Sequence, residues 1–157
     1  MTAIQERLFA LQDADYAAFQ RPLMPTVGEE AFIGVRTPAL RSLAKELRGS
    51  AEAEAFLVSL PHVYFEENQL HAFLIALEKD FDTALAQTDA FLPYVNNWAT
   101  CDQLTPKAFR KNRAARRSLL FLVGRARGRF SFQIRKMIWT VFTASLPRTP
   151  SEKSCIK

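Results

Sequence analysis

Trp98 and Asp102 stand four positions apart in the stretch NWATCDQL, the spacing that places two side chains on one face of a helix. An indole presents a π face that attracts positive charge, and a carboxylate stabilises a cation or accepts a proton. The pair therefore has residue types suited to a positively charged partner. From the spacing alone, a structural interpretation stays open, in which Trp98 is a core aromatic and Asp102 is a solvated or capping acid.

Asp102 is also the last acid before a long basic stretch. Residues 1–102 contain 7 Lys or Arg and 15 Asp or Glu, whereas residues 103–157 contain 14 Lys or Arg and one acid, Glu152. The two parts carry formal net charges of −8 and +13, consistent with +5 for the whole chain. This asymmetry indicates a surface that faces a polyanion, with a solvated charged face as the alternative.

The composition is typical of a folded soluble domain. Of the 157 residues, 48% are hydrophobic and 24% are charged, enough to build one domain with a core. Cys101 and Cys155 lie far apart, without a CxxC or Cys/His cluster, so we expect reduced thiols and no metal site. The N-terminus has no apolar signal region, and no run of about 18 apolar residues is present, so we expect a cytoplasmic protein without a membrane span.

The apolar periodicity is helical almost throughout, which predicts an all-α fold. The clearest helix lies in RTPALRSLAKELRG, where Thr37 is a suitable N-cap, Pro38 suits the first helical position and Gly49 is placed to end the helix. Its apolar stripe consists of Leu40, Leu43, Ala44 and Leu47.

Further helices are predicted from Ser50 to just before Pro61, over residues 66–80, 81–95 and 96–104, and within 118–123 and 130–146. The first half of the last segment also alternates like a strand, so a strand is the alternative there. Short turns marked by Pro or Gly indicate antiparallel helix pairs, which stack into an α-solenoid or a bundle. We expect a single helical-repeat domain over residues 1–146 and an unstructured polar tail over residues 147–157.

Several polar residues of these helices are expected to be structural. His71 lies beside an apolar stripe, and Cys101 is expected to be a small packed thiol. Glu66 and Glu67 are expected to be first-turn acids that favour the helix dipole. Trp139 is expected to be a core residue.

Three consecutive segments resemble the bacterial DNA alkylation repair proteins, which are built from HEAT-like helical repeats. The segments are IGVRTPALRSLAKEL, YFEENQLHAFLIALEKDFD and LPYVNNWATCDQLTPKAF, and the likeness runs from about Asp15 to about Lys111. The resemblance implies antiparallel helix pairs stacked as a HEAT-like α-solenoid. It also implies a monomeric, nucleoid-associated DNA glycosylase that needs no cofactor and removes cationic N3- or N7-alkylated purines from double-stranded DNA.

The resemblance further implies roles for individual residues. Asp102 would stabilise the oxocarbenium-like sugar that remains when the purine leaves, and Trp98 would lay its indole against the deoxyribose or the base. Arg135, in SFQIRKMIW, is the candidate for an arginine that holds the neighbouring phosphate. Further phosphate contacts are expected from Lys107, Arg110, Lys111, Arg113, Arg116 and Arg117, with a solvated basic run as the alternative.

Two sets of alternatives follow from the sequence. The resemblance fades after about Asn112, as expected either of a natural short variant or of a truncated gene or shifted reading frame. The alternatives to a glycosylase are a helical-repeat protein that binds DNA without chemistry and a repeat scaffold that binds another protein. Salt-dependent DNA binding separates the scaffold from the other two, and base excision separates the glycosylase from the non-catalytic binder.

Overall fold

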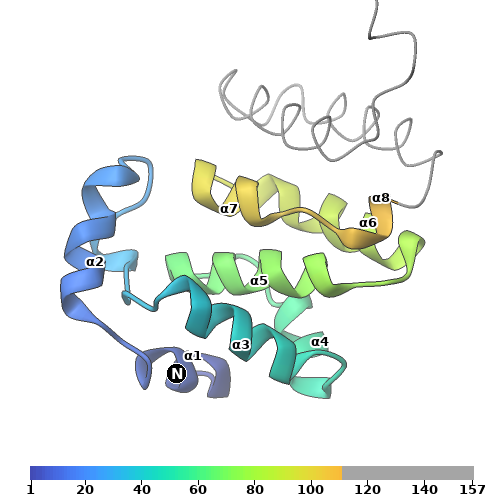
Figure 1. Cartoon of the computed structure of the whole chain (residues 1–157), viewed down its shortest axis with the longest axis horizontal. Coiled ribbons are helices and arrows are strands. Elements are labelled where there is room, and N and C mark those ends of the chain that lie inside the picture. Colours follow the sequence, from blue (N-terminus) through green and yellow to red (C-terminus); the bar gives the residue numbers. More distant parts are fainter. Residues whose placement is uncertain (111–157) are drawn as a thin grey trace, which may run out of the picture.

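The computed structural model of the chain describes residues 1–110, and this part is helical, with no β-strand among the described residues (Figure 1). The expected all-α fold is therefore confirmed. In chain order, the elements are α1 (Ala3–Phe9), α2 (Ala14–Gln20), η1 (Arg21–Leu23), η2 (Glu29–Ala31), α3 (Thr37–Leu47), α4 (Ala51–Val58), α5 (Phe65–Leu77), α6 (Phe81–Phe91), η3 (Leu92–Tyr94), α7 (Trp98–Gln103) and α8 (Lys107–Arg110), where η marks a short 3₁₀ helix.

Three layers of helices make up the described structure (Figure 1). α3, α5 and the consecutive helices α7 and α8 lie one above another, and α5 contacts both α3 and α7. The chain runs in the same direction along α3, α5 and α7, and α4 and α6 connect one layer to the next. This order agrees with the expected stack of antiparallel helix pairs.

α5 is the centre of the core, because it contributes to three hydrophobic clusters. Leu70, Phe73 and Leu74 pack with residues of α1, α3 and α4. Ala72 and Ile75 pack with residues of α6, α7 and α8. A helix that is apolar on most sides must be buried, so the layers on both sides of α5 are held by the same element.

The local signals in α3 act as the sequence predicts, with a shift of one residue at its start. Helix α3 begins at Thr37, so Arg36 is the N-cap and Pro38 occupies the second helical position. Gly49 follows the helix at φ +75°, the left-handed conformation expected there. The predicted stripe of Leu40, Leu43, Ala44 and Leu47 is buried. Each buried leucine contributes about 1.5–3 kcal/mol of hydrophobic free energy.

Glu66 and Glu67 lie in the first turn of α5, as expected, but both are buried and bind backbone amides. The Glu66 carboxylate accepts hydrogen bonds from the backbone N–H groups of Ile33 at 2.9 Å and Gly34 at 2.7 Å. Burial raises the pKa of Glu66, and these two hydrogen bonds oppose the rise. Glu66 therefore fixes the extended segment that leads into α3.

Candidate functional site

α7 is a six-residue helix whose position is set by side-chain hydrogen bonds at its start and in its middle. Asn97 is the N-cap, and its side-chain oxygen accepts a hydrogen bond from the Thr100 backbone N–H at 2.8 Å. The Gln69 side chain of α5 donates to the Thr100 hydroxyl at 3.0 Å, and both groups are buried. A helix this short is not stable alone, so its contacts with α5 determine which residues face outward.

Trp98 and Asp102 lie on the outward side of α7. Ala99, Thr100 and Cys101 are buried, whereas Trp98 is 46% exposed and Asp102 is exposed. The structural interpretation of Trp98 as a core aromatic is therefore wrong. Among residues 1–110, Asp102 makes no hydrogen bond or ion pair, so its carboxylate is open to solvent and to a ligand.

Trp98 contacts the N-terminal part of the chain. The indole Nε1–H donates to the backbone carbonyl of Leu23 in η1, at 3.1 Å. The Leu23 side chain is itself exposed, and so is Phe19 of α2. The hydrogen bond to Leu23 thus places η1 beside Trp98.

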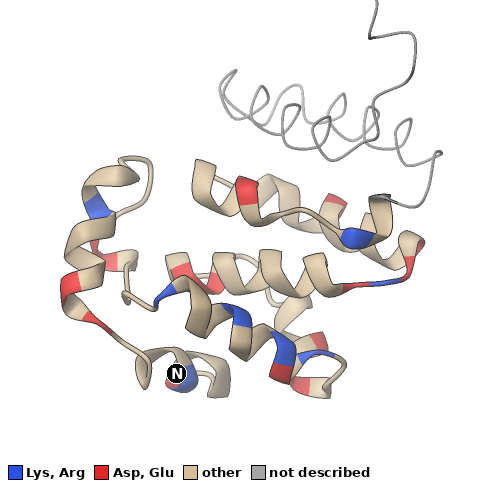
Figure 2. Ribbon diagram, viewed as in Figure 1, with Lys and Arg blue, Asp and Glu red and all other residues tan. Residues whose placement is uncertain are grey.

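The other end of α7 contacts a cation. Arg41 of α3 donates from Nη2 to the side-chain oxygen of Gln103 at 3.0 Å, and Gln103 directly follows Asp102. Figure 2 shows basic residues along α3 and on α8, and an acidic residue on α7. Sequence reasoning missed Arg41, although a signal was present, because Arg41, Lys45 and Arg48 follow helical spacing beside the apolar stripe.

The expected phosphate-binding residues fall partly within the described structure. Lys107 is exposed at the start of α8, and Arg110 is the last residue of that helix. The remaining candidates lie outside the described residues. They are Lys111, Arg113, Arg116, Arg117 and the expected phosphate-binding Arg135.

Cys101 and His71 are structural, as expected. Burial, together with the nearby Asp102 carboxylate, raises the pKa of the Cys101 thiol to about 12, so it is a protonated packing residue. The His71 ring, 1% exposed, stacks on Phe91 with ring centroids 4.0 Å apart. His71 Nδ1 lies 2.7 Å from His62 Nε2, which leaves neither ring near the Trp98–Asp102 site as a catalytic base.

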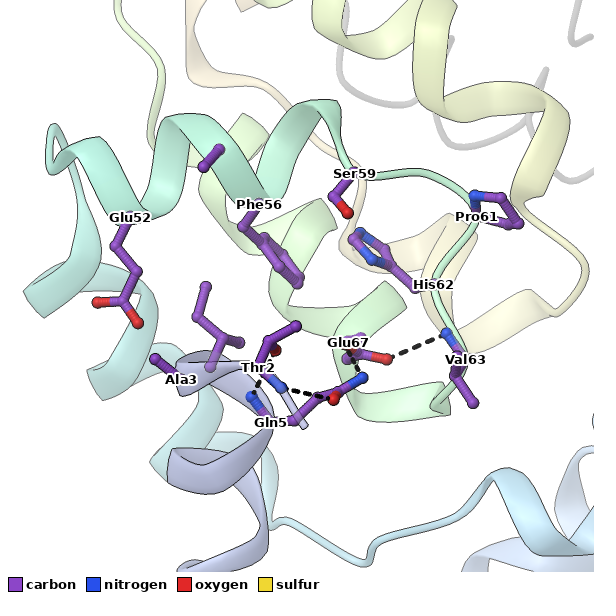
Figure 3. Close-up of a pocket in the computed structure, with 12 residues that line it drawn as sticks. Thr2, Ala3, Gln5, Glu52, Phe56, Ser59, Pro61, His62, Val63 and Glu67 are labelled. Atoms are coloured by element: carbon purple, nitrogen blue, oxygen red, sulfur yellow. Dashed lines mark hydrogen bonds between the residues drawn. The ribbon is translucent and has the colours of Figure 1, made fainter.

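A cavity of about 340 Å³ lies elsewhere in the molecule, between α1, α4 and the start of α5 (Figure 3). Its walls include Phe56, His62 and Glu67, and neither Trp98 nor Asp102 lines it. The Glu67 carboxylate is already occupied by the amides of Val63 and Tyr64 and by the Gln5 side chain. The cavity is therefore not the candidate site.

Metal-binding and membrane-spanning features are both absent from residues 1–110. Within this range, no group of three or more His, Cys, Asp or Glu side chains is arranged to hold a metal ion. No described helix has the length and apolar character needed to cross a membrane.

The stacked helical fold exposes a Trp and an Asp one turn apart, so α7 offers a π face and a carboxylate to a positively charged group. The family model described as DNA alkylation repair enzyme matches residues 4–122, and the chain belongs to this family. The match continues past Asn112, where the resemblance was expected to fade, and it ends before Arg135. No curated protein and no solved structure matches the chain.

Proposed function

We propose that this chain is an alkylpurine DNA glycosylase, which removes cationic N3- or N7-alkylated purines from duplex DNA. The observation that carries the proposal is the joint exposure of Trp98 and Asp102 on α7, in a member of the DNA alkylation repair enzyme family. Because both side chains are exposed, a ligand as large as duplex DNA can contact them.

The chemistry follows from the charge of the lesion. The alkylated purine takes the electron pair of its bond to C1′ and leaves as a neutral base, so the deoxyribose becomes oxocarbenium-like. Asp102 stabilises this cation, and water adds at C1′ and gives up a proton to the carboxylate. The product is an abasic site. Trp98 places its ring face against the cationic base or the sugar, where its quadrupole attracts positive charge.

The exposure of Asp102 suggests how the site approaches the damaged nucleotide. An enzyme that acts on a base from a deep pocket must extrude that base from the duplex. Asp102 is exposed, and α7 lies at the surface of the described structure (Figure 1). The proposal is therefore that the site approaches the sugar from the side of the DNA backbone, without a pocket that encloses the purine.

The test is release of free base from duplex DNA that contains 7-methylguanine. Asp102→Asn is expected to slow excision by about 10²–10³-fold, because the amide lacks the charge that stabilises the developing cation. Binding to the same duplex is expected to stay nearly unchanged, since phosphates are bound by other residues. Asp89→Asn is the matched control, because Asp89 is an exposed acid on α6 without a partner among the described residues.

The outcomes separate the proposal from its alternatives. Equal excision rates for the parent and Asp102→Asn would remove Asp102 from the mechanism. Salt-dependent duplex binding by a parent chain that releases no base would identify a non-catalytic DNA-binding protein. Absence of duplex binding would favour a scaffold that binds another protein.

A further inference from the structure

Arg41 of α3 contacts both of the other layers of the structure, α5 and α7. Its guanidinium carbon lies 5.2 Å from the centroid of the Phe73 ring in α5. Its Nη2 donates to Gln103 at the end of α7, 62 positions further along the chain. The side chain nonetheless remains exposed. A cation from α3 is thus bound to Gln103, the residue that follows the proposed catalytic carboxylate in the chain.

The charge of Arg41 is not neutralised by the described part of the protein. Arg7 pairs with Glu46 at 2.5 Å and with Glu52 at 3.7 Å. Arg36 pairs with Asp13 at 2.7 Å. In contrast, Arg41 has no carboxylate partner within residues 1–110, and its hydrogen bond goes to a neutral amide.

The geometry leaves most of the guanidinium available. An arginine carries five N–H donors in a planar fork that matches phosphate oxygens, and Gln103 takes one of them. The contact with the Phe73 ring and the hydrogen bond to Gln103 restrain the guanidinium, so less side-chain freedom is lost when a ligand binds. Lys45 and Arg48 continue the same stripe, but their place near the end of α3 is also explained by the helix dipole. Arg41 lies too far from that end for the dipole to explain it.

We propose that Arg41 binds a backbone phosphate of the duplex whose lesion lies at Asp102. The DNA-contacting surface then extends from α7 across the edge of α5 to α3. This inference rests on the proposed function, because duplex DNA is taken as the ligand at α7. It adds a phosphate contact from the N-terminal part of the chain, separate from the basic residues that follow Asp102.

The test measures the affinity of the full chain for duplex DNA containing 7-methylguanine across a series of salt concentrations. Arg41→Gln is expected to weaken binding several-fold at low salt and to reduce the log–log salt slope by about 0.9, the value of one lost phosphate contact. Arg41→Lys is expected to keep the parental slope, because the charge remains. Lys79→Gln is the charge-matched control, since Lys79 is an exposed cation in the turn after α5.

Two further variants separate phosphate binding from a purely structural role. Gln103→Ala removes the hydrogen-bond partner of Arg41 and keeps the cation, so it is expected to retain the parental slope. Arg41→Met keeps an apolar stem against Phe73 and is the second charge-removing variant if Arg41→Gln loses its fold. A reduced slope in Arg41→Gln or Arg41→Met, with an unchanged melting temperature, supports the inference.

The result that overturns the inference is a parental salt slope in a folded variant that lacks the Arg41 charge. If the parent excises 7-methylguanine in that case, the glycosylase proposal stands and Arg41 is not a phosphate contact. If the slope falls but no base is released, Arg41 binds DNA and the glycosylase proposal fails. A parent chain that does not bind the duplex overturns both proposals.

Discussion

The indole of Trp98 donates a 3.1 Å hydrogen bond to the backbone carbonyl of Leu23, a residue 75 positions earlier in the chain. This bond links the first residue of α7 to η1, while about half of the indole remains exposed. The ring is thereby oriented without being buried. A side chain held in this way presents a fixed π face to a ligand at little cost in rotamer entropy.

Replacing Trp98 with alanine is expected to impair excision more than stability. A fully buried tryptophan costs about 3–5 kcal/mol when truncated, whereas a half-exposed ring with one hydrogen bond is expected to cost about 1 kcal/mol. Trp98→Phe keeps an aromatic face and is expected to retain more activity than Trp98→Ala. Melting temperature and excision of 7-methylguanine check both variants. A loss of stability on the scale of a core residue would contradict the proposed role in ligand binding.

Glu66→Gln is expected to destabilise the fold by about 1–3 kcal/mol, measured by urea unfolding. The two oxygens of the buried Glu66 carboxylate each accept one hydrogen bond from a backbone N–H group. In glutamine one of these oxygens is replaced by an NH₂ group, which cannot accept a hydrogen bond. Glu54→Gln, at an exposed position of α4 with no partner in the described structure, is the control and is expected to change stability little. Equal stability of the two variants would show that Glu66 is dispensable for the entry into α3.

Gly34→Ala is expected to destabilise the fold by at least about 1–3 kcal/mol, again by urea unfolding. Gly34 has φ +91°, and an added Cβ would lie 2.1 Å from the Asp13 carbonyl oxygen. Gly49→Ala is the instructive control, because Gly49 has φ +75° but nothing within 4 Å of an added Cβ. The difference between the two variants isolates the steric clash from the backbone conformation. If Gly49→Ala proves equally harmful, the close approach to Asp13 is not the cause.

The His62–His71 pair is expected to make the protein less stable as the pH falls below about 6.5. Burial lowers the pKa of His62 to about 4, opposed by Glu67, and burial together with His62 lowers the pKa of His71 to about 3. Between these values and 6.5 the unfolded chain binds protons that the folded chain does not, so stability decreases with decreasing pH in this window. The loss is expected to be about 1–2 kcal/mol per histidine at pH 5.

The measurement for this pair combines thermal unfolding at several pH values with NMR titration of the two imidazoles. Figure 3 shows His62 beside Phe56, and the two rings stack with centroids 4.3 Å apart. Both histidines are expected to stay neutral in the folded protein down to about pH 5. A histidine that titrates near 6.5 in the folded state would show that the ring is solvated and that the acid sensitivity has another source.

The helices that the sequence predicted best are those with a strong local signal. The apolar stripe of α3, the glycine after its end and the start of the next helix at Ser50 were predicted correctly, because each depends on residues within one or two turns. The predicted N-cap of α3 was wrong by one residue, since Arg36 and not Thr37 is the N-cap. α1 and α2 were not predicted, since each is short and amphipathic only in part. Their caps were nevertheless present in the sequence, where Thr2 forms a capping box with Gln5 and Asp13 accepts from the Tyr16 backbone N–H.

The candidate site could be predicted only in part, because local spacing can be seen in the sequence and long-range packing cannot. Spacing places Trp98 and Asp102 on one face of a helix, but whether that face is exposed depends on how α7 packs against α5 through Thr100 and Gln69. The contact between Arg41 and Gln103 spans 62 positions and has no counterpart in any local pattern. Long-range contacts of this kind are set by the packing of whole layers, which periodicity alone does not specify.

The basic residues after Asp102 remain a prediction that a salt series can test. If Arg113 and Arg116 contact phosphates, replacing both with glutamine is expected to flatten the log–log salt slope of duplex binding by about two units, with little change in sequence preference. Lys153→Gln with Lys157→Gln is the matched control, because it removes the same charge from the segment expected to be a polar tail. A general electrostatic effect would flatten the slope equally in both double variants. A reduction confined to Arg113 and Arg116 would place these residues on the DNA, whereas parental slopes in both would show that the charges after Asp102 do not face the duplex.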